Sequence, residues 1–132
     1  MLRILNSTLA ILLFGFNAHA LTCESGKIRS FTNFEEHITE AEYCYNSDFN
    51  ELYSKSCENQ KCSAFESQEV IVPKDLKTHG FGTPGFKLCR RLSGKPEIID
   101  FWANGEWQHL DRCSFEDGYV DTGVLYKFYL KP

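Results

Sequence analysis

Hydrophobic and polar residues alternate most clearly near the C-terminal end of the chain. Residues 97–102 read Glu-Ile-Ile-Asp-Phe-Trp, and an aromatic-rich run follows at residues 107–115. Asn104-Gly105 lies between the two runs, and Asn-Gly in this setting is the strongest short-range signal for a two-residue β-hairpin turn. We therefore predict an antiparallel hairpin here, with a second turn at Asp117-Gly118.

A short helix is predicted on the N-terminal side of this hairpin. Thr83 is a favourable N-cap residue, Pro84 suits the first helical position, and Gly94 is placed to end the helix. We expect this helix to span residues 84–93.

Residues 120–130, after the hairpin, fit two kinds of element. Asp121 is a favourable cap for a helix whose inner face carries Leu125, Phe128 and Tyr129. The aromatic content of the same segment favours a strand. Between the two, we favour the helix.

The pattern is weaker before residue 69. Residues 27–31 alternate weakly, as in a strand. Asn33 followed by residues 34–38 resembles a capped helical turn, because Glu35 and Glu36 would lie near the positive end of a helix. We therefore expect a strand and then a helical turn in this region.

Two aromatic-rich runs follow, at residues 42–45 and 51–57. Both are strand-favouring, and residues 46–50 between them have the composition of a turn. We predict that the two runs form a hairpin.

An apolar run at residues 9–16 lies close to the N-terminus. Arg3 precedes it and Ala18-His19-Ala20 follows it, which is the order found in secretory signal peptides. An uncleaved anchor is the less favoured alternative, because a membrane-spanning helix needs about 20 consecutive apolar residues. We expect residues 1–20 to be a signal peptide and the mature protein to be periplasmic or secreted.

All six cysteines follow this segment: Cys23, Cys44, Cys57, Cys62, Cys89 and Cys113. Cysteines of a small secreted chain form disulfides far more often than metal sites or free thiols. The chain has no Cys-x-x-Cys pair, and its histidines are far apart in the sequence. We therefore expect disulfides, with no metal and no cofactor.

The cysteines and the turn-forming residues divide the mature chain. Residues 21–68 form an N-terminal cysteine-rich lobe, residues 69–83 a connector, and residues 84–132 a C-terminal helix–hairpin lobe. The predicted fold class is α+β: a small disulfide-stabilised domain with antiparallel hairpins and one or two short helices.

Disulfide pairing is expected within each lobe, because the first has four cysteines and the second has two. In the first lobe, the predicted hairpin favours Cys44 with Cys57, which leaves Cys23 with Cys62. Four cysteines nevertheless allow three pairings.

The chain is acidic, with 14 Lys and Arg against 18 Asp and Glu and a net charge of −4. Removal of residues 1–20 takes away one base and no acid, so the mature chain has 13 bases against 18 acids, a net charge of −5. This balance disfavours nucleic acid as a partner. We also expect no stable membrane insertion after the signal is cleaved.

The C-terminal lobe carries the motif Cys-x-Phe-x-Asp-Gly at residues 113–118, preceded by a short helix with Cys89 and by Thr83-Pro84. In these features residues 83–128 resemble a family of small bacterial secreted domains labelled haemolysins, which has no assigned function. The resemblance implies that Cys89 and Cys113 pair, and that their disulfide joins the helix to the hairpin. It implies no particular activity.

Five carboxylates in this lobe raise the question of a small secreted carboxylate-dependent hydrolase: Asp100, Asp111, Glu116, Asp117 and Asp121. Such an enzyme needs two carboxyls that face one cleft with different pKa values. We favour roles in turns, in a helix cap and in solvent for these residues, and a structural role for His109. No catalytic residue is assigned.

One basic cluster stands out in this acidic chain. Lys87, Arg90 and Arg91 are three and four residues apart on the predicted helix. A solvated helix face is the favoured explanation, and docking of an anionic partner is the functional one. With the aromatic residues Trp102 and Trp107, they form the set of candidate partner-binding residues.

Small size, disulfide density and exposed aromatic residues together favour a non-enzymatic binding or inhibitor-type module. The expected partner is an envelope or extracellular protein or polymer. The carboxylate-dependent hydrolase remains the alternative.

Overall fold

The computed structural model describes residues 20–68, 71, 74, 76 and 82–130 of the chain. The expected signal peptide, apart from Ala20, and most of the expected connector lie outside the described residues. None of the described helices is long and apolar enough to cross a membrane.

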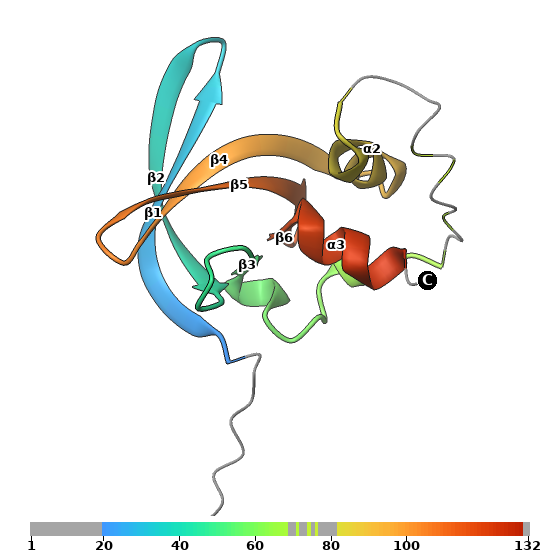
Figure 1. Ribbon diagram of the computed structural model, residues 1–132, viewed down its shortest axis with the longest axis horizontal. Coiled ribbons are helices and arrows are strands. Elements are labelled where there is room, and N and C mark those ends of the chain that lie inside the picture. The colour runs from blue at the N-terminus through green and yellow to red at the C-terminus, as the bar shows by residue number, and fades with distance from the viewer. Residues whose placement is uncertain (1–19, 69–70, 72–73, 75, 77–81, 131–132) are drawn as a thin grey trace, which may run out of the picture.

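Six antiparallel strands form a closed barrel (Figure 1). The strands are β1 (Thr22–Thr32), β2 (Glu35–Tyr45), β3 (Leu52–Ser54), β4 (Lys95–Ala103), β5 (Glu106–Phe115) and β6 (Gly118–Asp121). Their order around the barrel is β1-β2-β3-β6-β5-β4, and β4 pairs with β1 to close it. Strands from both sides of the expected connector therefore belong to one sheet.

The predicted α+β class is wrong, because the protein is an all-β barrel, against which the part of the chain that the structure describes packs two short α-helices, α2 and α3. The turn signals in the sequence specify single hairpins, each of which is local. Barrel closure depends on pairing of Ser30 with Ile99 and of Tyr53 with Val120. These pairs join distant parts of the chain, so no local pattern indicates them.

Two hairpins confirm the sequence predictions. Strands β4 and β5 pair along their full length around Asn104 and Gly105, which both have positive φ angles. Strands β2 and β3 also pair, with Tyr45 opposite Leu52.

The helical turn predicted after Asn33 is wrong. Residues 33 and 34 instead form a two-residue turn between β1 and β2, with φ angles of 52° at Asn33 and 65° at Phe34. Glu35 and Glu36, which were expected to begin a helix, are the first residues of β2. A long hairpin results, and it projects from the barrel (Figure 1).

Helices α2 (Pro84–Arg91) and α3 (Thr122–Tyr129) lie where helices were predicted. The Thr83 side chain accepts a hydrogen bond from the Phe86 amide, and that of Asp121 accepts one from the Val124 amide. Two 3-10 turns, η1 (Lys55–Cys57) and η2 (Ser63–Phe65), follow β3.

Gly94 does not itself supply the left-handed residue that ends α2. Ser93 has a φ angle of 65°, and the Gly94 amide donates a hydrogen bond to the Cys89 carbonyl. A Cβ atom at Gly94 would collide with Sγ of Cys113. Glycine is therefore needed here so that the backbone can approach the Cys89–Cys113 disulfide closely.

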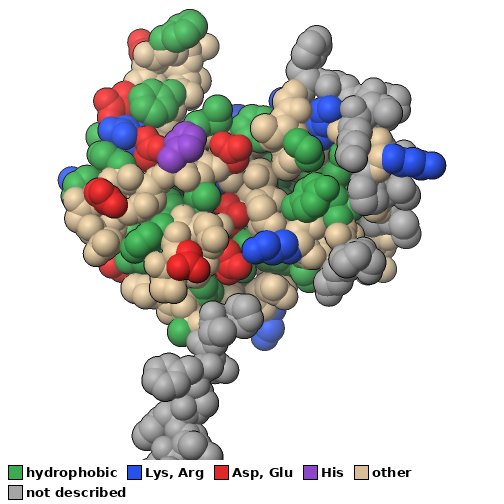
Figure 2. Space-filling view, viewed as in Figure 1, with side chains coloured by type: hydrophobic (Ala, Val, Ile, Leu, Met, Phe, Trp, Pro, Cys, Tyr) green, Lys and Arg blue, Asp and Glu red, His purple; other side chains and the backbone are tan. Residues whose placement is uncertain are grey.

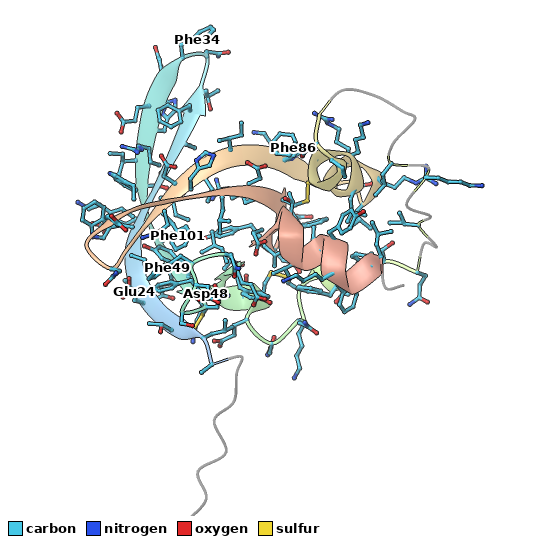
Figure 3. The ribbon with its side chains drawn as sticks, in the orientation of Figure 1. Glu24, Phe34, Asp48, Phe49, Phe86 and Phe101 are labelled. Carbon is cyan, nitrogen blue, oxygen red and sulfur yellow. A yellow bond between two sulfur atoms is a disulfide. The ribbon has the colours of Figure 1, made fainter. Side chains whose placement is uncertain are left out.

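One hydrophobic core fills the barrel. Its buried members are Ile28, Tyr43, Tyr45, Leu52, Ile99, Phe101 and Ala103. The ring centroids of Tyr43 and Tyr45 lie 5.8 and 5.6 Å from that of Phe101, which points into the barrel in Figure 3. The Tyr43 hydroxyl donates to the Trp102 carbonyl, and burial raises the pKa of Tyr43 to about 12.

A second core lies against the outside of the barrel. Successive side chains of a strand point to opposite faces, and Cys44, between Tyr43 and Tyr45 of the first core, belongs to the second. The buried members of this second core are Cys44, Tyr53, Cys57, Cys62, Ala64, Phe65, Ile71, Leu76, Leu88, Cys89, Cys113, Val120, Val124 and Leu125. Helices α2 and α3 and the 3-10 turns cover these residues, and we call this part of the molecule the covered side.

Three disulfides are present: Cys23–Cys44, Cys57–Cys62 and Cys89–Cys113. The last is the pairing that the resemblance implies. The pairings expected in the first lobe are wrong, because Cys23 lies directly opposite Cys44 in the β1–β2 ladder. Cys57 instead pairs with Cys62 across a short loop between η1 and η2.

Candidate functional site

The outside of the barrel opposite the covered side carries no described helix. The outward-pointing side chains of β2, β1, β4 and β5 line it, and we call this surface the outer face. Its residues are Ile38 on β2, Arg29 and Phe31 on β1, Ile98, Asp100 and Trp102 on β4, and Trp107 and His109 on β5.

Strand register brings the polar centre of the outer face together. Arg29 pairs with Ile38 on one side and with Asp100 on the other, and Asp100 pairs with His109. One row of four side chains therefore crosses four strands. Next to it, Trp102 pairs with Trp107.

Arg29, Asp100 and His109 form a hydrogen-bonded network. Nη2 and Nε of Arg29 lie 2.7 and 2.9 Å from Oδ2 of Asp100, and Nδ1 of His109 lies 2.9 Å from Oδ1. Burial raises the pKa of Asp100, but the hydrogen bonds from His109 and Arg29 outweigh it and leave the pKa below its ordinary value. The carboxylate is thus held charged and in a fixed position.

Aromatic rings surround this network. The Arg29 guanidinium lies 4.4 Å from the centroid of the Trp107 ring, and Trp102 meets Trp107 edge to face at 5.2 Å. A shallow groove of about 450 Å³ runs beside the two indoles, lined by Ser25, Gly26, Lys27, Ile38, Trp102 and Trp107. The centre of the outer face is therefore ordered rather than loosely solvated.

Most of the exposed large hydrophobic side chains of the described residues lie on the outer face. Five are exposed: Phe31, Phe34, Ile38, Ile98 and Trp102. Four of them lie on the outer face, and Phe34 lies at the tip of the β1–β2 hairpin. Figure 2 shows hydrophobic and acidic side chains along this projecting hairpin.

The structure separates the predicted partner-binding residues into two groups. Trp102 and Trp107 lie on the outer face, at the turn end of the β4–β5 hairpin. Lys87, Arg90 and Arg91 lie on α2, next to the opposite end of β4 (Figure 1). The basic cluster is therefore not part of the outer face.

The sequence prediction missed Arg29, Phe31 and Ile38. Residues 34–38 were interpreted as a helical turn, so no strand was expected beside β1. The sequence does contain a turn signal between Phe31 and Ile38. Asparagine, here Asn33, is common at the first position of a two-residue hairpin turn.

Three of the five carboxylates considered for hydrolysis, Asp100, Asp117 and Asp121, serve separate structural roles. Asp117 accepts a hydrogen bond from the Ser63 amide at 2.9 Å, and Asp121 accepts from the Leu52 and Val124 amides at 2.8 and 3.0 Å. Burial raises the pKa of Asp121 to about 6. Asp100 is bound to Arg29 and His109, so these three carboxylates do not share a cleft.

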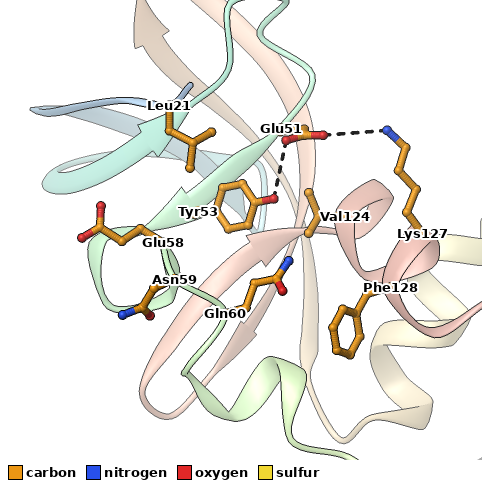
Figure 4. Close-up of a pocket in the computed structure, with 9 residues that line it drawn as sticks. All are labelled: Leu21, Glu51, Tyr53, Glu58, Asn59, Gln60, Val124, Lys127 and Phe128. Carbon is orange, nitrogen blue, oxygen red and sulfur yellow. Dashed lines mark hydrogen bonds and ion pairs between the residues drawn. The ribbon is translucent and has the colours of Figure 1, made fainter. Parts of the chain in front are cut away.

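A larger pocket, of about 510 Å³, lies between β3, the loop after η1, and α3 (Figure 4). Its charged groups already have partners: Glu51 lies 3.9 Å from Nζ of Lys127, and Glu58 lies 3.0 Å from Nζ of Lys55. The Tyr53 hydroxyl donates a hydrogen bond of 3.5 Å to Glu51. Burial raises the pKa of Tyr53. Nothing in this polar and open hollow points to a particular ligand.

The described residues that best resemble a metal site are Cys23, Cys44 and Glu58. Both sulfur atoms are bonded to each other, so neither is a thiolate that could bind a metal. Glu58 lies against this disulfide, with Oε2 3.2 Å from Sγ of Cys23.

Comparisons with known proteins give no identity. No protein-family model, no curated protein and no solved structure matches this chain. The resemblance of residues 83–128 to the secreted domain family stays a prediction. The outer face is the feature of the structure that bears on function.

Proposed function

We propose that the protein is a secreted or periplasmic binding module, without enzymatic activity, that docks a partner protein on its outer face. The observation that carries the proposal is the location of the five exposed large hydrophobic side chains, four of which lie on the outer face and the fifth at the adjoining hairpin tip. A concentration of such side chains, rimmed by polar groups, is typical of a protein–protein interaction site.

The composition of the outer face suits a protein partner. Trp, Phe and Arg are enriched in protein interfaces, and Trp and Arg are enriched among the residues that contribute most to affinity. Arg29 is fixed by Asp100 and by the Trp107 ring before any partner arrives. Binding would therefore cost little side-chain entropy at the centre of the interface.

The three disulfides support an oxidising location. The acidic balance of the chain argues against a nucleic-acid partner. An envelope or extracellular protein is thus the proposed class of partner.

A double variant, Ile38→Ser with Trp102→Ser, tests the proposal. Both side chains are exposed, so the variant should fold normally. We expect retention of a partner from envelope and culture-medium extracts to fall at least about tenfold relative to the wild-type oxidised protein.

Lys61→Ser is the matched control, because Lys61 is exposed in the loop between η1 and η2, which is part of the covered side. It should retain the partner as the wild type does. Equal retention by the double variant and the wild type would disprove docking on the outer face. The hydrolase alternative gains no support, because Asp100, Asp117 and Asp121 have separate partners.

A further inference from the structure

We propose that Phe34, at the tip of the β1–β2 hairpin, is an anchor that inserts into an apolar pocket of the partner protein, and that the rim of this pocket carries Lys or Arg side chains. The inference deepens the proposed function and depends on it. It adds a second contact, beyond the outer face, and specifies the chemistry of the partner.

Phe34 contributes nothing to the packing of the fold. Its exposed area is 106% of the reference value, so its ring buries no surface in the isolated protein. Figure 3 shows Phe34 at the far end of the projecting hairpin. A phenyl ring in this position exposes a large apolar surface to water without any compensating contact.

Phe34 also strains the backbone. Its φ angle is 65°, in the left-handed region that bulky residues rarely adopt. The β4–β5 hairpin has the same two-residue turn, and there the equivalent residue is Gly105, with a φ angle of 75°. Glycine satisfies this turn without strain, so the turn alone does not explain a phenylalanine.

The β1–β2 hairpin is negatively charged. Strand β2 continues from Phe34 with four carboxylates and no Lys or Arg: Glu35, Glu36, Glu40 and Glu42. Strand β1 adds Glu24 and two bases, Lys27 and Arg29. Arg29 is already bound to Asp100 and lies 3.7 Å from Glu36, so carboxylates remain in excess along the hairpin. A pocket that receives Phe34 would therefore meet a negative hairpin, which a cationic rim complements.

The same charges argue against a membrane as the target. Anionic lipid surfaces attract basic segments and repel acidic ones, and the hairpin residues beside Phe34 are Glu35 and Glu36. An isolated phenylalanine at an acidic tip fits a protein pocket better than a bilayer.

Site-specific photo-crosslinking in the cells that produce the full chain tests the inference. The probe is p-benzoylphenylalanine, introduced in place of Phe34, of Ile38 or, as the control, of Lys61, which is exposed on the covered side. We expect one discrete adduct from positions 34 and 38, and none from position 61.

Competition then shows whether the phenyl ring itself is recognised. Excess unlabelled wild-type protein should suppress the adduct from position 34, whereas Phe34→Gly should need at least about tenfold more protein to do so. Glu35→Lys in the probe-carrying protein should lower the adduct yield. Equal competition by Phe34→Gly would overturn the inference.

The position of the adducts separates this inference from the proposed function. Adducts from position 38 but not from 34 would preserve docking on the outer face and overturn the anchor. Adducts from neither position would overturn both. Binding to zwitterionic or anionic lipid vesicles that depends on Phe34, or an adduct with a second copy of this chain, would also overturn the inference.

A stability measurement checks the premise that Phe34 serves no structural purpose. We expect the urea midpoint of Phe34→Gly to equal or exceed that of the wild type. Gly105→Ala, with the same turn position, should lower the midpoint because its φ angle of 75° is strained for alanine. A lower midpoint for Phe34→Gly would show that the ring stabilises the fold and would overturn the inference.

Discussion

The covered side and the outer face are two halves of the outside of one barrel, yet they differ in almost every respect. On the covered side, the two helices and the 3-10 turns bury outward-pointing strand residues such as Tyr53 and Val120. On the outer face, Phe31, Ile38, Ile98 and Trp102 remain exposed. The apolar side chains of the covered side are buried by other parts of the same chain, whereas those of the outer face still expose apolar area that a partner can bury.

Two of the three disulfides follow the same division. Cys57–Cys62 lies wholly in the second core, as does Cys89–Cys113, which fastens α2 to β5. Cys23–Cys44 instead joins directly opposite positions of β1 and β2. The outer face is ordered by strand pairing and by the Arg29–Asp100–His109 network, with no disulfide among its residues.

Among the changes that test this comparison, removal of the Cys89–Cys113 disulfide should cause the largest loss of stability. The double variant Cys89→Ala, Cys113→Ala releases a cross-link between residues 24 apart, for which chain entropy predicts a loss of about 3 to 4 kcal/mol. Urea unfolding of the oxidised protein measures the change. An unchanged midpoint would show that the covered side does not depend on this disulfide.

The pH dependence of stability should distinguish the two sides. At the N-cap of α3, the helix that packs on the covered side, burial raises the pKa of Asp121 from 3.8 to about 6. The folded protein then holds a proton that the unfolded chain has released, so the free energy of unfolding falls as pH rises from about 4 to about 6. The full loss would be about 3 kcal/mol. Asp121→Asn should remove this slope in urea unfolding at several pH values.

Asp100, on the outer face, provides the opposite case. Its pKa is lowered overall by His109 and Arg29, so its contribution is present above its unfolded pKa and is lost as pH falls below that value. Asp100→Asn should therefore reduce the fall in the free energy of unfolding at the acid end of the pH range. It should leave the change in that free energy between pH 4 and 6 intact. If Asp121→Asn and Asp100→Asn changed stability over the same range of pH, the contrast between the two carboxylates would be wrong.

The smallest expected effect concerns two neighbours on β4. Ile98 points outward and is exposed, whereas Ile99 is fully buried in the barrel core. Ile98→Ala should change the free energy of unfolding by no more than about 0.5 kcal/mol. Ile99→Ala, the matched control, should cost about 2 to 5 kcal/mol. Similar losses from both would mean that the outer face is packed rather than free.

Much of the C-terminal part could be predicted from sequence because its signals are local. Thr83 and Asp121 cap the helices that they were expected to cap, and Asn104-Gly105 forms the expected turn. The β1–β2 hairpin was missed because Phe34 occupies a turn position where glycine is usual. With β2 unrecognised, Arg29 and Ile38 had no expected partners, and half of the outer face was left out.

By itself, the sequence determined the short-range features: the two helix caps, two of the hairpin turns, and six cysteines that can form disulfides. Only the tertiary structure decided that Cys23 pairs with Cys44, that β1 meets β4, and that Trp102 and Trp107 lie beside Arg29. Caps and turns depend on residues within a few positions of each other. Pairing between distant strands depends instead on which closed sheet buries the most apolar surface, and that is a property of the whole chain.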